Sequence, residues 1–143
     1  MAQKLSQRLA EIVEALPLKP GIRILEIGCG TGAAAREIAQ RIGDGYILGI
    51  DRSSKAIGQA LKSSEAEILK GSLNFRQVEI ENFELGQYEE QFDIAFAVRV
   101  GALDGRHPEI EREAIAKIAK MLKPDGKLFI DGGNPLKEIC WLL

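Results

Sequence analysis

The sequence predicts an α/β protein built on a doubly wound parallel sheet. Short apolar segments alternate along the chain with segments whose apolar residues recur at helical spacing, and this alternation is typical of a parallel sheet covered by helices. A glycine-rich turn follows the first apolar segment, in the stretch ILEIGCGTG at residues 24–32. Exposed backbone N–H groups at such a turn, together with the start of the next helix, suit an anionic or electron-rich ligand. The sequence therefore predicts a nucleotide-type site at this turn.

The spacing of apolar residues and the turn residues predict the individual elements. Strands are expected at residues 22–27, 46–50, 75–80, 92–98 and 127–131. Helices are expected at residues 3–16, 33–42 and 108–122, with a further helix that begins at Ser53 or Ser54. Residues 63–73 either extend that further helix or form a short helix of their own that ends near Gly71. The first helix is expected to pack on the sheet or to cover the site, and residues 123–126 are expected to form a type I turn.

Length and composition favour one domain over residues 1–143. The chain has 143 residues, of which 45% are apolar, and this is enough for a core of its own. The net charge of −2 provides no basic field, so nucleic acid is not a favoured partner. Cys29 and Cys140 stand apart, without the spacing of a metal site or a disulfide framework. No apolar run approaches the roughly 20 residues that span a bilayer. We therefore expect a soluble, cytoplasmic protein with no metal and no membrane partner.

Three motifs have the order and spacing of one family. ILEIGCGTG at residues 24–32, GIDRS at 49–53 and LKPDGKLFI at 122–130 resemble the class I S-adenosylmethionine-dependent methyltransferases, and the resemblance covers residues 20–131. It implies a Rossmann-like, three-layer α/β/α fold of about five strands in the order 3-2-1-4-5. It also implies S-adenosylmethionine as the cofactor.

The first motif supplies five candidates for cofactor binding. The resemblance places Glu26 near the methionine part of the cofactor, where its carboxylate can balance the sulfonium charge. Gly28, Gly30 and Gly32 let the backbone approach a ligand closely, and Cys29 lies on the same loop. The alternative for the glycines is a tight turn between strand and helix that binds nothing.

The ends of the second and third strands supply further candidates. Asp51 follows the first loop glycine by 23 residues, and a carboxylate there can accept hydrogen bonds from both ribose hydroxyls. The alternative is that Asp51 caps the next helix, while Arg52 either flanks the adenine or is a solvated charge. The resemblance implies an acid for the adenine amino group and a backbone N–H for the ring, which fall on Glu79 and Ile80. Glu81 replaces Glu79 if the register slips.

In the family that the chain resembles, the end of the fourth strand lies beside the methionine part of the cofactor and beside the incoming substrate. Val98 is expected to lie against the cofactor there. Arg99 is a candidate for binding an acidic group of the substrate, the alternative being a solvated arginine. His107, the only histidine, is a candidate base, the alternative being a residue that precedes Pro108 at a helix start.

These residues predict methyl transfer from S-adenosylmethionine to a small-molecule acceptor. Holding the nucleophile in line with the methyl group supplies most of the acceleration, so a dedicated base is optional. One alternative is an NAD(P)-dependent oxidoreductase, which the spacing G-x-G-x-G disfavours against G-x-G-x-x-G. The other alternative is a methyltransferase-like module without catalysis that acts through a partner.

The C-terminal part of the sequence favours the alternative of a module without catalysis. Most family members continue past the fifth strand with a helix and two more strands, and this chain is expected to lack the usual antiparallel strands, as a short or C-terminally truncated member. The fifth strand would then be an open sheet edge. An apolar tail follows it, with Leu136, Ile139, Cys140 and Trp141. Either this tail folds over the edge or a second chain does, and a homodimer through strand five and the tail is expected.

Overall fold

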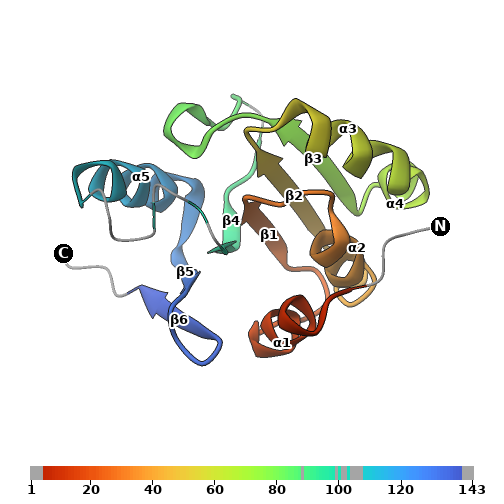
Figure 1. Cartoon of the computed structure of the whole chain (residues 1–143), viewed down its shortest axis with the longest axis horizontal. Helices are drawn as coiled ribbons and strands as arrows, with labels where there is room; N and C mark the ends of the chain where they lie inside the picture. The colour runs from red at the N-terminus through yellow and green to blue at the C-terminus, as the bar shows by residue number, and fades with distance from the viewer. Residues whose placement is uncertain (1–4, 88, 99, 101–102, 104–107, 140–143) are drawn as a thin grey trace.

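The protein is described from a computed structural model, which covers residues 5–87, 89–98, 100, 103 and 108–139. The strands are β1 (Arg23–Ile27), β2 (Tyr46–Asp51), β3 (Leu73–Gln77), β4 (Phe92–Ala97), β5 (Leu122–Asp131) and β6 (Leu136–Ile139). They form one sheet in the order β3-β2-β1-β4-β5-β6 (Figure 1). The first five strands run parallel, and β6 is antiparallel to β5. The predicted order of the first five strands is confirmed.

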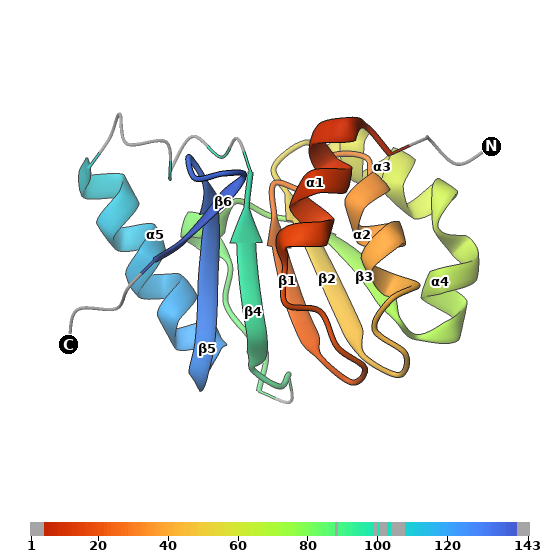
Figure 2. The same ribbon diagram turned by 90° about the horizontal axis from the view of Figure 1, so that it is seen from below.

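Helices cover both faces of this sheet. They are α1 (Gln7–Ala15), α2 (Ala33–Ala39), α3 (Ser54–Ser63), α4 (Glu65–Lys70) and α5 (Pro108–Met121), with a 3-10 helix, η1 (Ile80–Asn82). Successive strand residues point to opposite faces, so Ile24 packs in a core with α1, α2 and α3, and Leu25 packs in a second core with α5 and η1. Figure 2 shows α1 and α2 together in front of the sheet, with α5 beside β5. The three-layer architecture is confirmed.

The sixth strand corrects the expectation that the chain lacks antiparallel strands. Residues 132–135 turn the chain back, so that Leu136 pairs with Asp131 and Ile139 with Leu128. Leu136 and Ile139 are partly buried against the two cores. The tail itself therefore covers the edge of β5, and the open edge that motivated a homodimer is closed. Cys140 and Trp141 lie outside the described residues.

Two element boundaries differ from the prediction, those of β3 and β5, and the open choice for residues 63–73 is decided. β3 ends at Gln77, so Glu79 follows the strand and precedes η1. Of the two alternatives for residues 63–73, the separate short helix is confirmed: α4 ends at Lys70 and is capped by Gly71, whose φ of 89° is left-handed. β5 already begins at Leu122, and its register against β4 shifts beside residues 123–126, where the sequence predicted a turn. The shift at β3 matters most, because it places Glu79 between the strand and η1.

The described residues contain neither a membrane-spanning helix nor a cluster of metal-binding side chains. None of the helices in this part of the chain is long and apolar enough to cross a membrane. The same part contains no group of three or more His, Cys, Asp or Glu side chains that could hold a metal ion.

Candidate functional site

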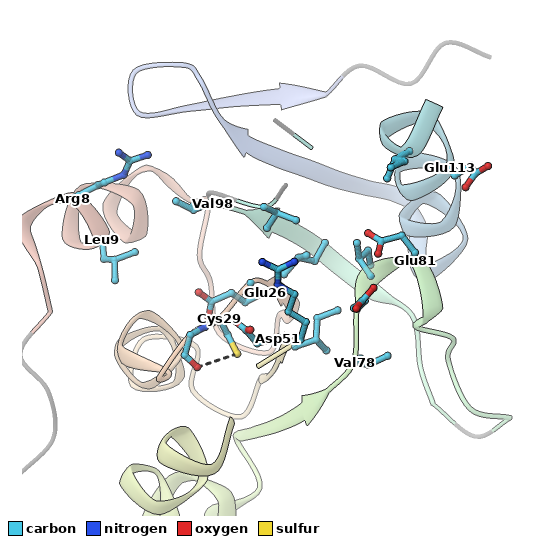
Figure 3. A pocket seen from close by; sticks show the side chains of 18 of the residues that line it. Arg8, Leu9, Glu26, Cys29, Asp51, Val78, Glu81, Val98 and Glu113 are labelled. Carbon is cyan, nitrogen blue, oxygen red and sulfur yellow. Dashed lines mark hydrogen bonds between the residues drawn. The ribbon is translucent and has the colours of Figure 1, made fainter. Parts of the chain in front are cut away.

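A cavity of about 940 Å³ opens at the carboxyl ends of β1, β2 and β4 (Figure 3). Such ends are where doubly wound sheets bind ligands. The predicted site residues that line the cavity are Glu26, Gly28, Cys29, Gly30, Asp51, Arg52, Glu79, Ile80 and Val98. Gly32 does not line it, and Arg99 and His107 lie outside the described residues. The structure thus brings the described candidates from four separate segments to one cavity.

Glycine is required for different reasons at Gly32 and at Gly30 in the loop after β1. A Cβ atom on Gly32 would lie 2.6 Å from Cζ of Phe75, so only glycine fits against the sheet there. A Cβ atom on Gly30 would meet no atom within 4 Å. Gly30 also has a left-handed φ of 56° and lines the cavity. The loop therefore presents bare backbone to open space at Gly30, as a cradle for a ligand requires.

The N–H groups of this loop are engaged inside the protein. Those of Gly28 and Cys29 donate to the carbonyl oxygen of Ile50 at 2.8 and 3.0 Å. That of Gly30 donates to Oδ2 of Asp51 at 2.8 Å. The expectation of exposed N–H groups that bind an anion is therefore wrong for these three residues. The polar groups that face the cavity here are carboxylates, which suit a ligand that donates hydrogen bonds.

Asp51, the last residue of β2, is fixed on both carboxylate oxygens. Oδ2 accepts from Gly30, and Oδ1 accepts from the backbone N–H of Ser53 at 2.9 Å. Helix α3 is capped by Ser53, whose Oγ accepts from the N–H of Ala56 at 3.1 Å. The alternative that Asp51 caps this helix is therefore wrong. Each carboxylate oxygen can accept a second hydrogen bond, so the group remains able to bind two neighbouring hydroxyls.

Glu26 is the buried carboxylate of the site. Its residue is only 5% exposed, and Oε1 has no hydrogen-bond partner among the described residues. Burial raises the pKa of Glu26 to about 8; the negative charge of Asp51 adds to the rise and the positive charge of Arg36 opposes it. A buried acceptor without a partner is costly in a folded protein. Glu26 is thus prepared for a cationic or hydrogen-bond-donating group in the cavity.

Cys29 lines the cavity, and its residue is largely buried. The residue is 7% exposed and packs in the cluster under α1, α2 and α3. A Cβ atom on Gly49 of β2 would lie 2.9 Å from Cβ of Cys29, so the thiol side lies against the sheet. Burial raises the pKa of the Cys29 thiol, and the charges of Glu26 and Asp51 raise it further. Both effects disfavour the thiolate, which is the nucleophilic form of cysteine.

The segment after β3 forms another wall of the cavity. Glu79 is exposed and Ile80 is buried, and both line the cavity together with Glu81. Burial, a hydrogen bond with Glu79 and the charge of that residue raise the pKa of Glu81. Glu79 and Glu81 were alternatives for one role in the sequence, whereas the structure brings both to the site. Arg52 lines the same cavity with an exposed side chain.

Several lining residues were not predicted individually. Ser6, Arg8 and Leu9 reach the cavity from the start of α1, and Ile110 and Glu113 reach it from α5. Figure 3 shows Arg8 and Leu9 on one side of the pocket and Glu113 on the opposite side. For the residues of α1, the sequence offered one indication: the amphipathic pattern of this helix predicted that it covers the sheet or the site. Nothing in the pattern of α5 distinguished its lining residues from its solvated ones.

The fold and the site define a class of protein: a Rossmann-like domain whose cofactor cavity is bounded by a glycine loop and by acids after the first and second strands. A family model described as a methyltransferase domain matches residues 18–140. The chain therefore belongs to the class I S-adenosylmethionine-dependent methyltransferase family, as its motifs predicted.

Several curated relatives are more than 30% identical to this chain, and two of them are described as O-methyltransferases of fungi. An O-methyltransferase of Pyrenophora dematioidea is 35% identical over 120 residues, which are 84% of this chain and 42% of the relative. The O-methyltransferase rstn1 of Aspergillus nomiae is 34% identical over 134 residues, which are 90% of this chain and 56% of the relative. The chain thus spans about half the length of the curated relatives it matches.

Solved structures agree with this fold. A methyltransferase from Thiobacillus denitrificans in complex with S-adenosyl-L-homocysteine has a TM-score of 0.69 at 26% identity, covering 88% of this chain and 48% of that one. The [4+2]-cyclase SpnF has a TM-score of 0.66 at 31% identity, covering 86% of this chain and 43% of that one. The same fold therefore occurs in a protein described as a methyltransferase and in one described as a cyclase.

Proposed function

We propose that this chain binds S-adenosylmethionine in the cavity and transfers its methyl group to a hydroxyl oxygen of a small molecule. The observation that carries the proposal is the pairing of Glu26 and Asp51 at neighbouring strand ends, on one wall of a cavity of about 940 Å³. Oxygen as the acceptor atom is supported by the two relatives above, both described as O-methyltransferases.

The residues present fit this cofactor. Asp51 offers two fixed carboxylate oxygens for the ribose hydroxyls. Oε1 of Glu26 is buried without a partner among the described residues, and a positively charged amino group would satisfy it. Gly30 leaves open space beside the loop.

Further residues complete the proposed cradle. Glu79 would accept from the adenine amino group, and the backbone of Ile80 would meet the ring. Arg52 would flank the adenine, and Val98 would lie against the methionine part. All four line the same cavity as Glu26 and Asp51.

The chemistry requires positioning and one base, because the hydroxyl must lose its proton to a base as its oxygen forms the bond to the methyl group, and His107 stays the candidate for that base. When bound, the cofactor supplies an electrophilic methyl group whose leaving group is a neutral thioether. The chain holds the cofactor at the strand ends and excludes water with the apolar side chains of Leu9, Val98 and Val100, which line the cavity. Orientation of this kind is worth several kcal/mol in bimolecular reactions.

A titration followed by a transfer assay tests the proposal. Isothermal titration of the protein with S-adenosylhomocysteine should give a dissociation constant in the micromolar range, and NADH should not bind. Methyl-labelled S-adenosylmethionine should then label one or more members of a panel of phenols and hydroxy acids. Binding of NADH without binding of S-adenosylhomocysteine would refute the cofactor assignment.

A second candidate function is a cofactor-binding domain that does not transfer the methyl group. The similarity to the [4+2]-cyclase favours it, because that protein has this fold and is described by a different reaction. Tight binding of S-adenosylhomocysteine with no labelled product across the whole panel would support this candidate over methyl transfer.

A further inference from the structure

Arg36 is a buried charge that the proposed function has not used. It lies in α2, is only 6% exposed, and is the one basic residue buried in the described part of the chain. Arginine is rarely buried unless its charge is paired. Its position directly after the glycine loop therefore requires an explanation.

The guanidinium group lies against the underside of that loop. Nη1 donates to the carbonyl oxygen of Thr31 at 2.9 Å and to Oγ of Ser64, the residue before α4, at 3.0 Å. A Cβ atom on Gly32 would lie 3.0 Å from the same nitrogen. Arg36 thus ties the loop to a second segment of the chain, and it fixes the backbone on which Gly30 lies.

The second guanidinium nitrogen has no hydrogen-bond partner in the described part of the chain. Nη2 of Arg36 is buried and forms no hydrogen bond with the described residues, and the same holds for Oε1 of Glu26. Two buried groups of opposite charge therefore each keep one unused polar atom near the loop. The other charged or titratable groups that act on them are Asp51 of β2, Cys29 of the loop and Glu67 of α4.

Arg36 and Glu26 each favour the charged form of the other. Burial lowers the pKa of Arg36, and the negative charges of Glu67 and Glu26 oppose that change. In return the positive charge of Arg36 lowers the pKa of Glu26, against burial and Asp51, which raise it. Removing Arg36 would leave Glu26 with burial and a like charge alone, and both disfavour its ionised form.

We propose that Arg36 is a positioning residue for cofactor binding. Its guanidinium holds the glycine loop through the hydrogen bond to the carbonyl oxygen of Thr31. It also supplies the buried positive charge that allows Glu26 to ionise when a cationic group enters the cavity. The inference rests on the proposed function, because it takes the ligand to be S-adenosylmethionine or S-adenosylhomocysteine.

The test measures the affinity for S-adenosylhomocysteine across a range from about pH 6 to about pH 9. Affinity of the unmodified protein should rise with pH as Glu26 ionises. Arg36→Met should weaken binding about tenfold at neutral pH and should move the midpoint of the pH dependence upward by about one unit. Arg36→Lys keeps the charge, so it should retain the original midpoint even where its affinity is lower.

Two further variants serve as controls. Arg41 is exposed, pairs with Glu14 and Glu37, and lies outside the cavity, so Arg41→Met should leave both affinity and midpoint unchanged. Ser64→Ala removes one acceptor of the guanidinium and should weaken binding about threefold, since one hydrogen bond to a charged group is lost, without moving the midpoint.

Each outcome decides one point. A folded Arg36→Met with the original affinity and midpoint would overturn the role of Arg36. A midpoint that moves equally in Arg36→Lys and Arg36→Met would overturn the charge argument. If Arg36→Met does not fold, original affinity in Ser64→Ala would overturn the loop argument. Failure of the unmodified protein to bind S-adenosylhomocysteine at any pH would instead refute the proposed function.

Discussion

Oδ2 of Asp51 accepts a hydrogen bond from the backbone N–H of Gly30 at 2.8 Å, so the end of β2 fixes the loop that follows β1. One carboxylate therefore has two tasks: it holds the loop in place and it lines the cavity with acceptors. The ribose site and the glycine loop are for this reason not independent, and a change at either position is expected to affect both.

Asp51→Ala should weaken the binding of S-adenosylhomocysteine by about 1 to 3 kcal/mol, since the ribose hydroxyls lose their acceptors and the Gly30 N–H loses its partner. Isothermal titration measures this. Ser53→Ala is the matched control, because it removes the cap of α3 and should cost about 1 kcal/mol of unfolding free energy with little change in affinity. Unchanged affinity in Asp51→Ala would exclude Asp51 from the site.

The two loop glycines should respond differently to alanine. In Gly32→Ala the new Cβ would lie 2.6 Å from the ring of Phe75, so the protein should unfold at a clearly lower temperature. In Gly30→Ala the Cβ meets no protein atom, so the cost to stability is the left-handed φ alone, about 1 kcal/mol, while affinity for the cofactor falls. Thermal unfolding and titration of both variants check this, and equal loss of stability would contradict it.

Glu26 should make stability depend on pH. Its pKa of about 8 in the folded protein lies above the ordinary value of 4.5, so the folded state binds more protons than the unfolded state between these values. The unfolding free energy should therefore fall as pH rises from about 5 to about 8, by up to about 1.4 kcal/mol per pH unit.

Glu26→Gln isolates this effect, because glutamine has nearly the same shape and does not titrate. Urea unfolding of both proteins at several pH values gives the difference in slope that belongs to Glu26 alone. The variant should be at least as stable as the unmodified protein at about pH 8 and should bind S-adenosylhomocysteine more weakly. Parallel pH profiles for the two proteins would show that Glu26 is not buried as described.

The ion pair between Arg8 and Asp131 joins α1 to the end of β5 at 3.2 Å, but its side chains are 49% and 28% exposed. Exposed pairs contribute little, so Arg8→Ala should change the unfolding free energy by less than about 1 kcal/mol. Thermal unfolding measures this. A loss well above that value would mean that the pair holds α1 over the cavity.

The sequence predicted the parallel order of the sheet and the placement of Glu26 and Asp51, because Glu26 is the last but one residue and Asp51 the last residue of buried strands with clear apolar patterns. It did not predict β6, since a four-residue strand with two charged residues at its centre has no strong pattern and forms only by pairing with β5. The end of β3 was also missed, because Val78 to Ile80 alternates like a strand but belongs to the loop and to η1.

Arg36 shows a different limit. In the helix sequence AAAREIA an arginine is expected to be solvated, and helical spacing alone does not reveal that this face lies under the glycine loop. Its burial follows from the tertiary contacts with Thr31 and Ser64, one of which lies 28 residues away. Likewise, the free N–H groups expected in the loop are used by Ile50 and Asp51 of the neighbouring strand.

A crystal structure of the protein grown with S-adenosylhomocysteine tests the central claim most directly. We predict density in the cavity with both ribose hydroxyls within hydrogen-bond distance of the Asp51 carboxylate, and with the amino group of the ligand beside Oε1 of Glu26. A ligand bound elsewhere, or one whose ribose does not contact Asp51, would contradict the account.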